Sequence, residues 1–421
     1  MITLLKNASI LYGKELDYIG SADIVIRDGL FDSIIIDRDA TTNSNSSRNV
    51  CIYNNNCYHY YYDSNRFDSI VDCEGLLIMP SFINAHTHIA DSIAKDIASE
   101  GLSFNESIHP VFGVKRRVLN NTIEEHLMHF IKASALTMIK NGITTFIDFR
   151  EQGLDGVRLL KASLNGISIR CIALGRVEYY ERDLSDEELR EAEHVIDYAD
   201  GFGLSGANEY SDNALKQLAM IARTKKKLFG LHACESEESY SYSLSKYGVS
   251  EVKRIVSLVE PDFLVHMTNA TDDDLMYVKE NGIGIVVCPR ANASLGVGIP
   301  RVWDMLRLGC IVAIGTDNVM LNKPDMFREM EYIWKVSRAL KHGVNAKYIL
   351  KMATVNAARI FRLSKIGYID NGTRADAIII DKYHVDIAHM HNPYVALVQR
   401  ASESSIKGVM VNGNIIYGNI G

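Results

Sequence analysis

The stretch "FINAHTHIAD", residues 82–91, ends a long apolar run with two histidines, His86 and His88. In a β-strand, side chains two positions apart project to the same face, so both imidazoles could hold one metal ion. The His-X-His pattern is weak evidence alone, because a chain of 421 residues with 13 histidines should contain about one such pair by chance. A second pair, His389 and His391 in "IAHMHNPY", provides a comparison within the same chain.

Between the two ends of the chain, the sequence alternates short apolar runs with longer helical segments. This pattern predicts βα units around a parallel sheet. Eight candidate strands favour a (β/α)8 barrel, which is an α/β fold. In chain order they read "LLIMPSFINAH", "ITTFIDF", "SIRCIAL", "GFGLSG", "KLFGLHA", "DFLVHM", "GIGIVVC" and "CIVAIGTD".

The two ends of the chain have a different pattern. The first 38 residues alternate short β-rich runs with turn residues, and the stretch "IKGVMVNGNIIYG" near the C-terminus returns to short strands around an Asn-Gly turn. We therefore expect both ends to form one small β domain. Residues 40–68 are crowded with Asn, Ser and Tyr, which indicates a surface insertion without chemistry; its tyrosines could alternatively cover an apolar face.

Composition narrows the class of protein. A formal net charge of -7 and a pI near 6.0 provide no basic surface, so we expect a small-molecule substrate and no nucleic acid. Seven cysteines without a Cys-x-x-Cys motif argue against disulfides and thiolate zinc sites, and favour reduced thiols in the cytoplasm. No apolar run approaches 18 residues, so no membrane segment is expected. Homo-oligomers are common among soluble enzymes, which makes a homodimer or homotetramer the default expectation.

Polar side chains gather where the candidate strands end. Active sites of α/β barrels lie at the C-terminal ends of the strands. The fifth strand ends in "LHACE" with His232 and Glu235, the sixth in "LVHMT" with His266, and the eighth in "IGTDN" with Asp317. A lone buried histidine is usually a satisfied core residue, but agreement among four strand ends favours a site at the barrel mouth. His389 and His391 do not follow a candidate barrel strand, so we expect this pair in a loop or an interface.

The sequence resembles the amidohydrolase superfamily, in the branch of amino-heterocycle deaminases and chlorohydrolases that includes S-adenosylhomocysteine deaminase. The resemblance implies a (β/α)8 barrel at residues 77–364, flanked by a β-sandwich built from residues 1–76 and 365–421. It rests on an ordered series of segments: "PSFINAHTH", "NGITTFIDF", "LHACE", "LVHMT", "CPRANASLGVG", "IGTDN", "MATVNAARIF" and "GTRADAIIID".

The resemblance also implies one divalent metal held by His86, His88, His232 and Asp317. Such a nitrogen and oxygen ligand set suits zinc, with iron(II) as the alternative. The metal would lower the pKa of water from 15.7 toward about 7. Asp317 would then accept a proton from the water, His266 would orient it, and Glu235 would protonate the ring nitrogen and the departing amine.

The fourth candidate strand departs from two patterns found among relatives. Many binuclear relatives carry a carboxylated lysine there, but "DGFGLSGANEYSD" contains no lysine, so we expect a mononuclear centre. Adenosine-type deaminases of this branch usually show a substrate-binding histidine in a "PHAPY"-like segment. This chain has Gly206 or a close neighbour there, which argues against an adenosine-like substrate.

Four further residues are candidates for substrate binding: Arg150, Glu151, Arg176 and Asn292. We predict a metal-dependent hydrolase of non-peptide C–N bonds, with hydrolytic deamination of an amino-substituted nitrogen heterocycle as the leading activity. A cyclic amidase or chlorohydrolase of the same superfamily is the alternative reaction. A catalytically inactive barrel that serves as a binding protein is the alternative from another class, because fold alone does not imply activity.

Overall fold

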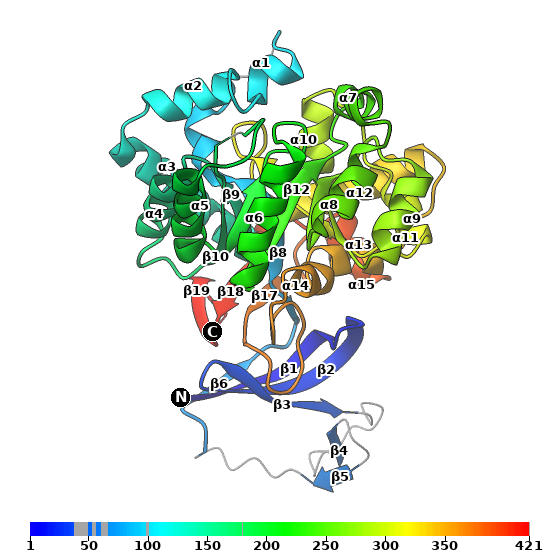
Figure 1. The fold of residues 1–421 in the computed structure, drawn as a ribbon. Helices are drawn as coiled ribbons and strands as arrows, with labels where there is room; N and C mark the ends of the chain where they lie inside the picture. Colours follow the sequence, from blue (N-terminus) through cyan, green and yellow to red (C-terminus); the bar gives the residue numbers. More distant parts are fainter. Residues whose placement is uncertain (38–48, 53–55, 60–65, 98–100, 179, 421) are drawn as a thin grey trace.

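The computed structural model describes residues 1–37, 49–52, 56–59, 66–97, 101–178 and 180–420. A parallel sheet surrounded by helices forms the larger part, and an antiparallel sheet from both ends of the chain lies at one end of it (Figure 1). Helices α1 (Phe104–Ile108) and α2 (Val114–Asn121) lie at the opposite end. None of the helices in the described part of the chain has the length and apolar composition needed to cross a membrane.

The parallel sheet is a closed barrel. Its hydrogen-bonded order is β15-β14-β13-β12-β11-β10-β9-β8-β16. Only Gly315 and Thr316 separate β15 from β16, so these two strands are the halves of one broken strand, and β16 closes the sheet by pairing with β8. The predicted (β/α)8 barrel is confirmed. The strands are β8 (Phe82–His88), β9 (Ile143–Arg150), β10 (Arg170–Gly175), β11 (Gly201–Leu204), β12 (Leu228–Ala233), β13 (Phe263–His266), β14 (Gly284–Val287), β15 (Val312–Ile314) and β16 (Asp317–Asn318).

Helices connect these strands and cover the outside of the barrel (Figure 1). Beyond α1 and α2 they are η2 (Ile89–Ala94), α3 (Glu124–Lys140), α4 (Gly153–Ser163), α5 (Asp186–Tyr198), α6 (Asp212–Thr224), α7 (Glu237–Tyr247), α8 (Glu251–Val259), α9 (Asp272–Glu280), α10 (Pro289–Ser294), α11 (Val302–Arg307), α12 (Met326–Ala339), α13 (Ala346–Met352) and α14 (Val355–Ile360).

The barrel strands bury apolar side chains on both faces. In β13, Phe263 and Val265 join the cluster inside the barrel, whereas Leu264 joins the cluster between the strands and the outer helices. Alternation of side chains along a strand produces this division. Strands buried on both faces read as continuous apolar runs, which is why the sequence marks them clearly.

The antiparallel sheet combines strands from the two ends of the chain, as predicted. Its order is β19-β18-β17-β7-β1-β2-β3-β4-β5, and β6 also pairs with β1. The sheet is mainly antiparallel, because β1 pairs in parallel with β6 and β7 while the other pairs are antiparallel. Apolar side chains from β1, β2, β3, β7, β17 and β18 share one core. The strands are β1 (Ile2–Tyr12), β2 (Asp17–Arg27), β3 (Leu30–Asp37), β4 (Asn49–Ile52), β5 (Asn56–His59), β6 (Ser69–Asp72), β7 (Leu76–Pro80), β17 (Ala377–Asp381), β18 (Ile406–Val411) and β19 (Asn414–Gly418). Helices α15 (Pro393–Gln399) and η3 (Glu403–Ser405) separate β17 from β18.

One predicted strand is wrong. The run "LLIMPSFINAH" forms two strands in different sheets, because β7 pairs with β17 and β1 of the antiparallel sheet while β8 pairs with β9 of the barrel. The chain passes from one sheet to the other at Ser81, whose hydroxyl lies 2.6 Å from that of Thr144. Residues 77–80, predicted as barrel, therefore belong to the antiparallel sheet. Every residue of both strands is buried, so the apolar run hides the junction.

The predicted insertion at 40–68 lies largely outside the described residues. Its described parts include β4 and β5, which pair with each other, and β4 also pairs with the end of β3 at the edge of the antiparallel sheet. These strands are the last two in the order of that sheet, and the barrel strands belong to the other sheet.

We predict that replacing residues 43–65 with a short linker preserves the fold and turnover, because its described strands, β4 and β5, lie at the edge of the antiparallel sheet. Circular dichroism and steady-state kinetics on the shortened chain test this. A large fall in turnover with an unchanged far-ultraviolet spectrum would show that the segment reaches the active site.

Candidate metal centre

Four histidines and one aspartate meet at the C-terminal ends of the barrel strands. His86 and His88 end β8, His232 lies near the end of β12, His266 ends β13, and Asp317 begins β16. All are buried. Ligand atoms of His86, His88 and His232 lie within 4.8 Å of one another, as do those of His86, His266 and Asp317. We call these five residues the histidine–aspartate cluster. All five were candidate site residues from the sequence.

The shortest distances in the cluster run from His86. Its Nε2 atom lies 3.2 Å from Nε2 of His232 and 3.2 Å from Oδ1 of Asp317. Nε2 of His88 lies 3.6 Å from the same Asp317 oxygen. Three imidazole nitrogens and one carboxylate oxygen therefore face a common point.

The opposite ring nitrogens fix the tautomers of two histidines. Nδ1 of His232 lies 2.8 Å from the carbonyl oxygen of Leu204. Nδ1 of His88 lies 3.0 Å from the carbonyl oxygen of Phe149 and 2.9 Å from Oε1 of Glu151. Because these acceptors require an N–H donor, each Nε2 presents a lone pair to the cluster.

The electrostatics of the cluster fit a bound cation. Burial lowers the pKa values of His86 and His232 well below the usual value for histidine, and it lowers the pKa of His88 to about 3. The three rings are therefore neutral. Converging lone pairs beside a carboxylate repel one another, and a divalent cation at their centre removes that repulsion. Neutral imidazoles with a carboxylate are a ligand set that zinc accepts.

Unusual backbone geometry directs these side chains. His266 and Asp317 have φ values of 73° and 59°, in the left-handed region that few residues other than glycine adopt. A Cβ atom on Gly315 would lie 2.6 Å from Cβ of His86, so the close approach of the broken strand to β8 requires glycine. The side chain of Asn84 in β8 accepts a hydrogen bond of 2.9 Å from the backbone N–H of Thr316 and so fixes the register there.

Glu235 lies beside His266, a member of the cluster. Oε2 of Glu235 lies 3.5 Å from Nε2 of His266. Burial, followed by the charge of Asp317, raises the pKa of Glu235 well above its usual value, so the side chain can carry a proton at neutral pH. Nδ1 of His266 lies 3.1 Å from Nδ2 of Asn292, which holds the ring in place.

Two cavities adjoin the cluster. The inner cavity, of about 90 Å³, is lined by residues that include His88, His232, Glu235, His266 and Asp317. The outer cavity, of about 720 Å³, lies between the segment around α2 and helices α4 and α5. Both cavities are lined by Ile108, His109, Pro110, Lys115 and Arg176.

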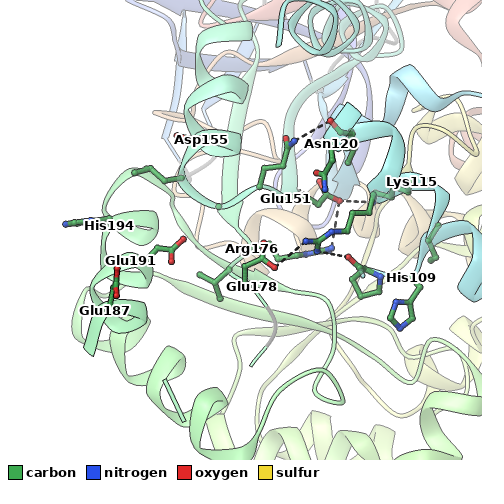
Figure 2. Close-up of a pocket in the computed structure, with 18 of the residues that line it drawn as sticks. His109, Lys115, Asn120, Glu151, Asp155, Arg176, Glu178, Glu187, Glu191 and His194 are labelled. Carbon is green, nitrogen blue, oxygen red and sulfur yellow. Dashed lines mark hydrogen bonds and ion pairs between the residues drawn. The ribbon is translucent and has the colours of Figure 1, made fainter. Parts of the chain in front are cut away.

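The outer cavity has charged walls. Figure 2 shows Lys115, Glu151 and Arg176 grouped on one side and Glu187, Glu191 and His194 of α5 on the other. Nζ of Lys115 lies 2.8 Å from Oε1 of Glu151, and Nη1 of Arg176 lies 3.9 Å from the same oxygen.

The four residues predicted to bind substrate occupy different places. Arg176 lines both cavities, and Glu151 lines the outer one. Arg150 and Asn292 are fully buried and line neither cavity. Arg150 instead donates hydrogen bonds to the carbonyl oxygen of Gly156 and to Glu151, so it supports the turn after β9.

Sequence reasoning missed Lys115 and Glu209, both of which line the inner cavity. Lys115 begins the basic run "KRR" in α2, and only folding shows that it alone of the three is buried. Glu209 lies five residues beyond the end of β11, within the stretch "SGANEYSD" that we searched only for lysine and histidine.

The comparison pair lies elsewhere. His389 and His391 are exposed, in the segment between β17 and α15. Within the described part of the chain, neither belongs to a group of side chains that could hold a metal ion.

Comparisons with known proteins agree with this geometry. The model of the "Amidohydrolase family" matches residues 77–416. An uncharacterised protein of Methanocaldococcus jannaschii is 40% identical over 74% of this chain and 80% of its own length. A 5-methylthioadenosine/S-adenosylhomocysteine deaminase of Acetivibrio thermocellus is 27% identical over 100% of this chain and 94% of its own. The crystal structure of a zinc-bound adenosine deaminase from Xanthomonas campestris has a TM-score of 0.82 at 20% identity, covering 99% of this chain and 93% of that chain.

We predict that the purified protein binds about one equivalent of zinc or iron per chain, because the ligand atoms converge on one point. Elemental analysis after exhaustive dialysis measures this. About two equivalents, both lost in the His86→Ala variant, would contradict a mononuclear centre.

We also predict that His88→Ala abolishes metal binding and turnover, because it removes a converging Nε2 lone pair. His389→Ala, which removes an exposed histidine of the comparison pair, is the control and should leave metal binding and turnover near the wild-type level. Metal content and activity of the two variants provide the test, and equal losses would show that the comparison pair also serves the metal.

Proposed function

The chain belongs to the amidohydrolase family, and from this premise we propose that it removes an amino group from a nitrogen heterocycle by hydrolysis and releases ammonia. The observation that carries the proposal is the position of Glu235, a separate acid beside the histidine–aspartate cluster. The 27% identical relative named as a deaminase supports the same reaction class. The fold similarity to a zinc-bound adenosine deaminase is compatible with it.

We assign His86, His88, His232 and Asp317 as the residues that would hold one divalent ion, zinc in the first place and iron(II) as the alternative. When bound, the ion would act as a Lewis acid and lower the pKa of a water molecule toward about 7. The neutral histidines contribute no positive charge of their own, so the ion would supply the positive charge at the point where their Nε2 atoms and the Asp317 oxygen converge.

Asp317 and His266 would act on the attacking water, Asp317 by accepting a proton and His266 by orienting it. Oδ1 of Asp317 faces His86 and His88, whereas Oδ2 has no hydrogen-bond partner among the described residues. That second oxygen can accept a proton from water. His266, held by Asn292, can orient the same water by a hydrogen bond from its ring.

Glu235 supplies the proton that the substrate needs. Addition of water to an aromatic C–NH2 carbon places negative charge on the adjacent ring nitrogen, and Glu235 protonates that nitrogen as the charge develops. Ammonia leaves readily only after the amine is protonated, so Glu235 then passes the proton that Asp317 took from the water to the amine. As ammonia departs and the carbonyl forms, the remaining hydroxyl proton returns to Glu235. A chloride leaving group requires no such proton.

Residues at the boundary between the two cavities would contact the parts of the substrate away from the reacting carbon. Lys115 and Arg176 are buried cations that line both cavities, and Glu151 lies against each of them. We assign Arg176 and Glu151 to contacts with substituents on the ring. Asn292 and Arg150 contribute indirectly, Asn292 by holding His266 and Arg150 by holding Glu151.

We predict that Glu235→Gln lowers kcat for an amino substrate by about 10²- to 10⁴-fold and leaves the metal bound, because it removes only the proton donor. Ammonia release and metal content measure the two effects. Glu237→Gln, an exposed glutamate two residues along the chain, is the matched control and should behave like the wild type.

A panel of candidate substrates tests the type of reaction. It comprises aminopurines, aminopyrimidines, pterins, amino- and chlorotriazines and hydantoins, and each compound is scored for release of ammonia, release of chloride and ring opening. Ammonia from at least one amino compound supports deamination. Ring opening or chloride release alone would replace deamination with one of the alternative reactions, and wild-type turnover by Glu235→Gln would remove Glu235 from the mechanism.

A further inference from the structure

Two polar side chains of the inner cavity have no part in the reaction proposed above. Ser205 directly follows β11, and Glu209 lies four residues further on. Both line the inner cavity together with Glu235 and His266. Oγ of Ser205 and Oε2 of Glu209 are shielded from solvent and have no hydrogen-bond partner among the described residues. Shielded polar atoms in folded proteins are nearly always paired, so these two indicate a missing partner.

Gly206 provides the space that the Glu209 carboxylate occupies. A Cβ atom on Gly206 would lie 2.8 Å from Oε2 of Glu209, closer than real Cβ contacts allow. Gly206 or a close neighbour is also where the sequence departs from the histidine pattern of adenosine-type deaminases. The absence of a side chain at Gly206 and the placement of a carboxylate over it are therefore two aspects of one arrangement.

The backbone around Glu209 is firmly held. Arg254 of α8 is buried and donates hydrogen bonds to the carbonyl oxygens of Ala207, at 3.2 Å, and of Tyr210, at 3.3 Å. Arg254 also donates to Oδ1 of Asp212 at 2.7 Å. These contacts fix the chain on both sides of Glu209, so the carboxylate is presented to the cavity by a rigid loop.

Burial also favours a ligand that donates hydrogen bonds. It raises the pKa of Glu209 to about 7, because the charged form is poorly solvated there, and a neighbouring N–H donor would compensate for the lost water. Charge-assisted hydrogen bonds of this kind are the stronger ones in proteins.

We propose that Ser205 and Glu209 form a subsite that accepts hydrogen bonds from N–H donors on the edge of the substrate ring. This inference rests on the proposed deamination and makes it more specific. The preferred substrates are amino-heterocycles that carry a second amino group or a ring N–H besides the amino group that is removed. A site built to pair a donor discriminates strongly against an analogue that lacks it.

Binding is measured in the metal-loaded Glu235→Gln variant, which should keep the metal but turn over too slowly to disturb a titration, so the subsite is tested separately from turnover. Isothermal titration would compare two matched pairs without a ring N–H, 9-methyl-2,6-diaminopurine with 9-methyladenine and 2,4-diaminopyrimidine with 4-aminopyrimidine. This variant should bind the diamino member of at least one pair about tenfold or more tightly. Equal binding within both pairs, binding of neither pair, or a preference for the monoamino members would overturn the inference. Binding with that preference, together with no ammonia release by the wild-type protein, would contradict only the proposed reaction.

Variants then assign the preference to Glu209. Glu209→Leu removes both carboxylate oxygens and should reduce the preference to within about twofold. Glu181→Gln, an exposed glutamate outside both cavities, should retain it. Thermal melting and metal content confirm that each variant is folded and loaded. A preference that persists in folded, loaded Glu209→Leu would overturn the subsite.

Discussion

The structure depends on the convergence of imidazole lone pairs and one carboxylate at the mouth of the barrel. Backbone and side-chain acceptors hold the Nδ1 protons of His88 and His232 on the outer side of the rings, so the Nε2 atoms can only face inward. Without a cation this arrangement is repulsive. The cost is offset by the closed barrel, whose strands hold the ligands, and by Gly315, which lets the broken eighth strand bring Asp317 against β8.

The side chains around this centre have different roles that follow from their positions. Glu235 and His266 lie together on one side, where an acid and a hydrogen-bonding ring can reach the same reacting carbon. Lys115, Glu151 and Arg176 stand at the boundary with the outer cavity, where they can meet substituents and not the reacting atoms (Figure 2). Ser205 and Glu209 extend the inner wall from the loop after β11. Residues near the metal ligands can thus transfer protons, while residues on the cavity walls can bind the rest of the substrate.

Much of this could be predicted from the sequence because parallel barrel strands end at one mouth. His86, His232, His266 and Asp317 follow separate apolar runs, and the topology alone brings them together. Junctions were harder to predict: the run containing β7 and β8 is buried throughout, and no change in apolarity marks the passage between sheets at Ser81.

Side chains that act from helices and loops were also hard to predict. Lys115 cannot be distinguished from its basic neighbours until α2 is packed, and Glu209 depends on the empty space above Gly206. Arg150 and Asn292 illustrate the opposite problem, since they follow strands as ligands do but turn their polar atoms to other side chains and to the backbone.

The central claim is that one cation completes the histidine–aspartate cluster and that His86, His88, His232 and Asp317 are its ligands. Anomalous diffraction from crystals of the metal-loaded chain tests it most directly. We expect a single anomalous peak at about 2.0–2.2 Å from Nε2 of each of the three histidines and from Oδ1 of Asp317. A second peak beside the first, or a peak that lies away from these four atoms, would contradict the claim.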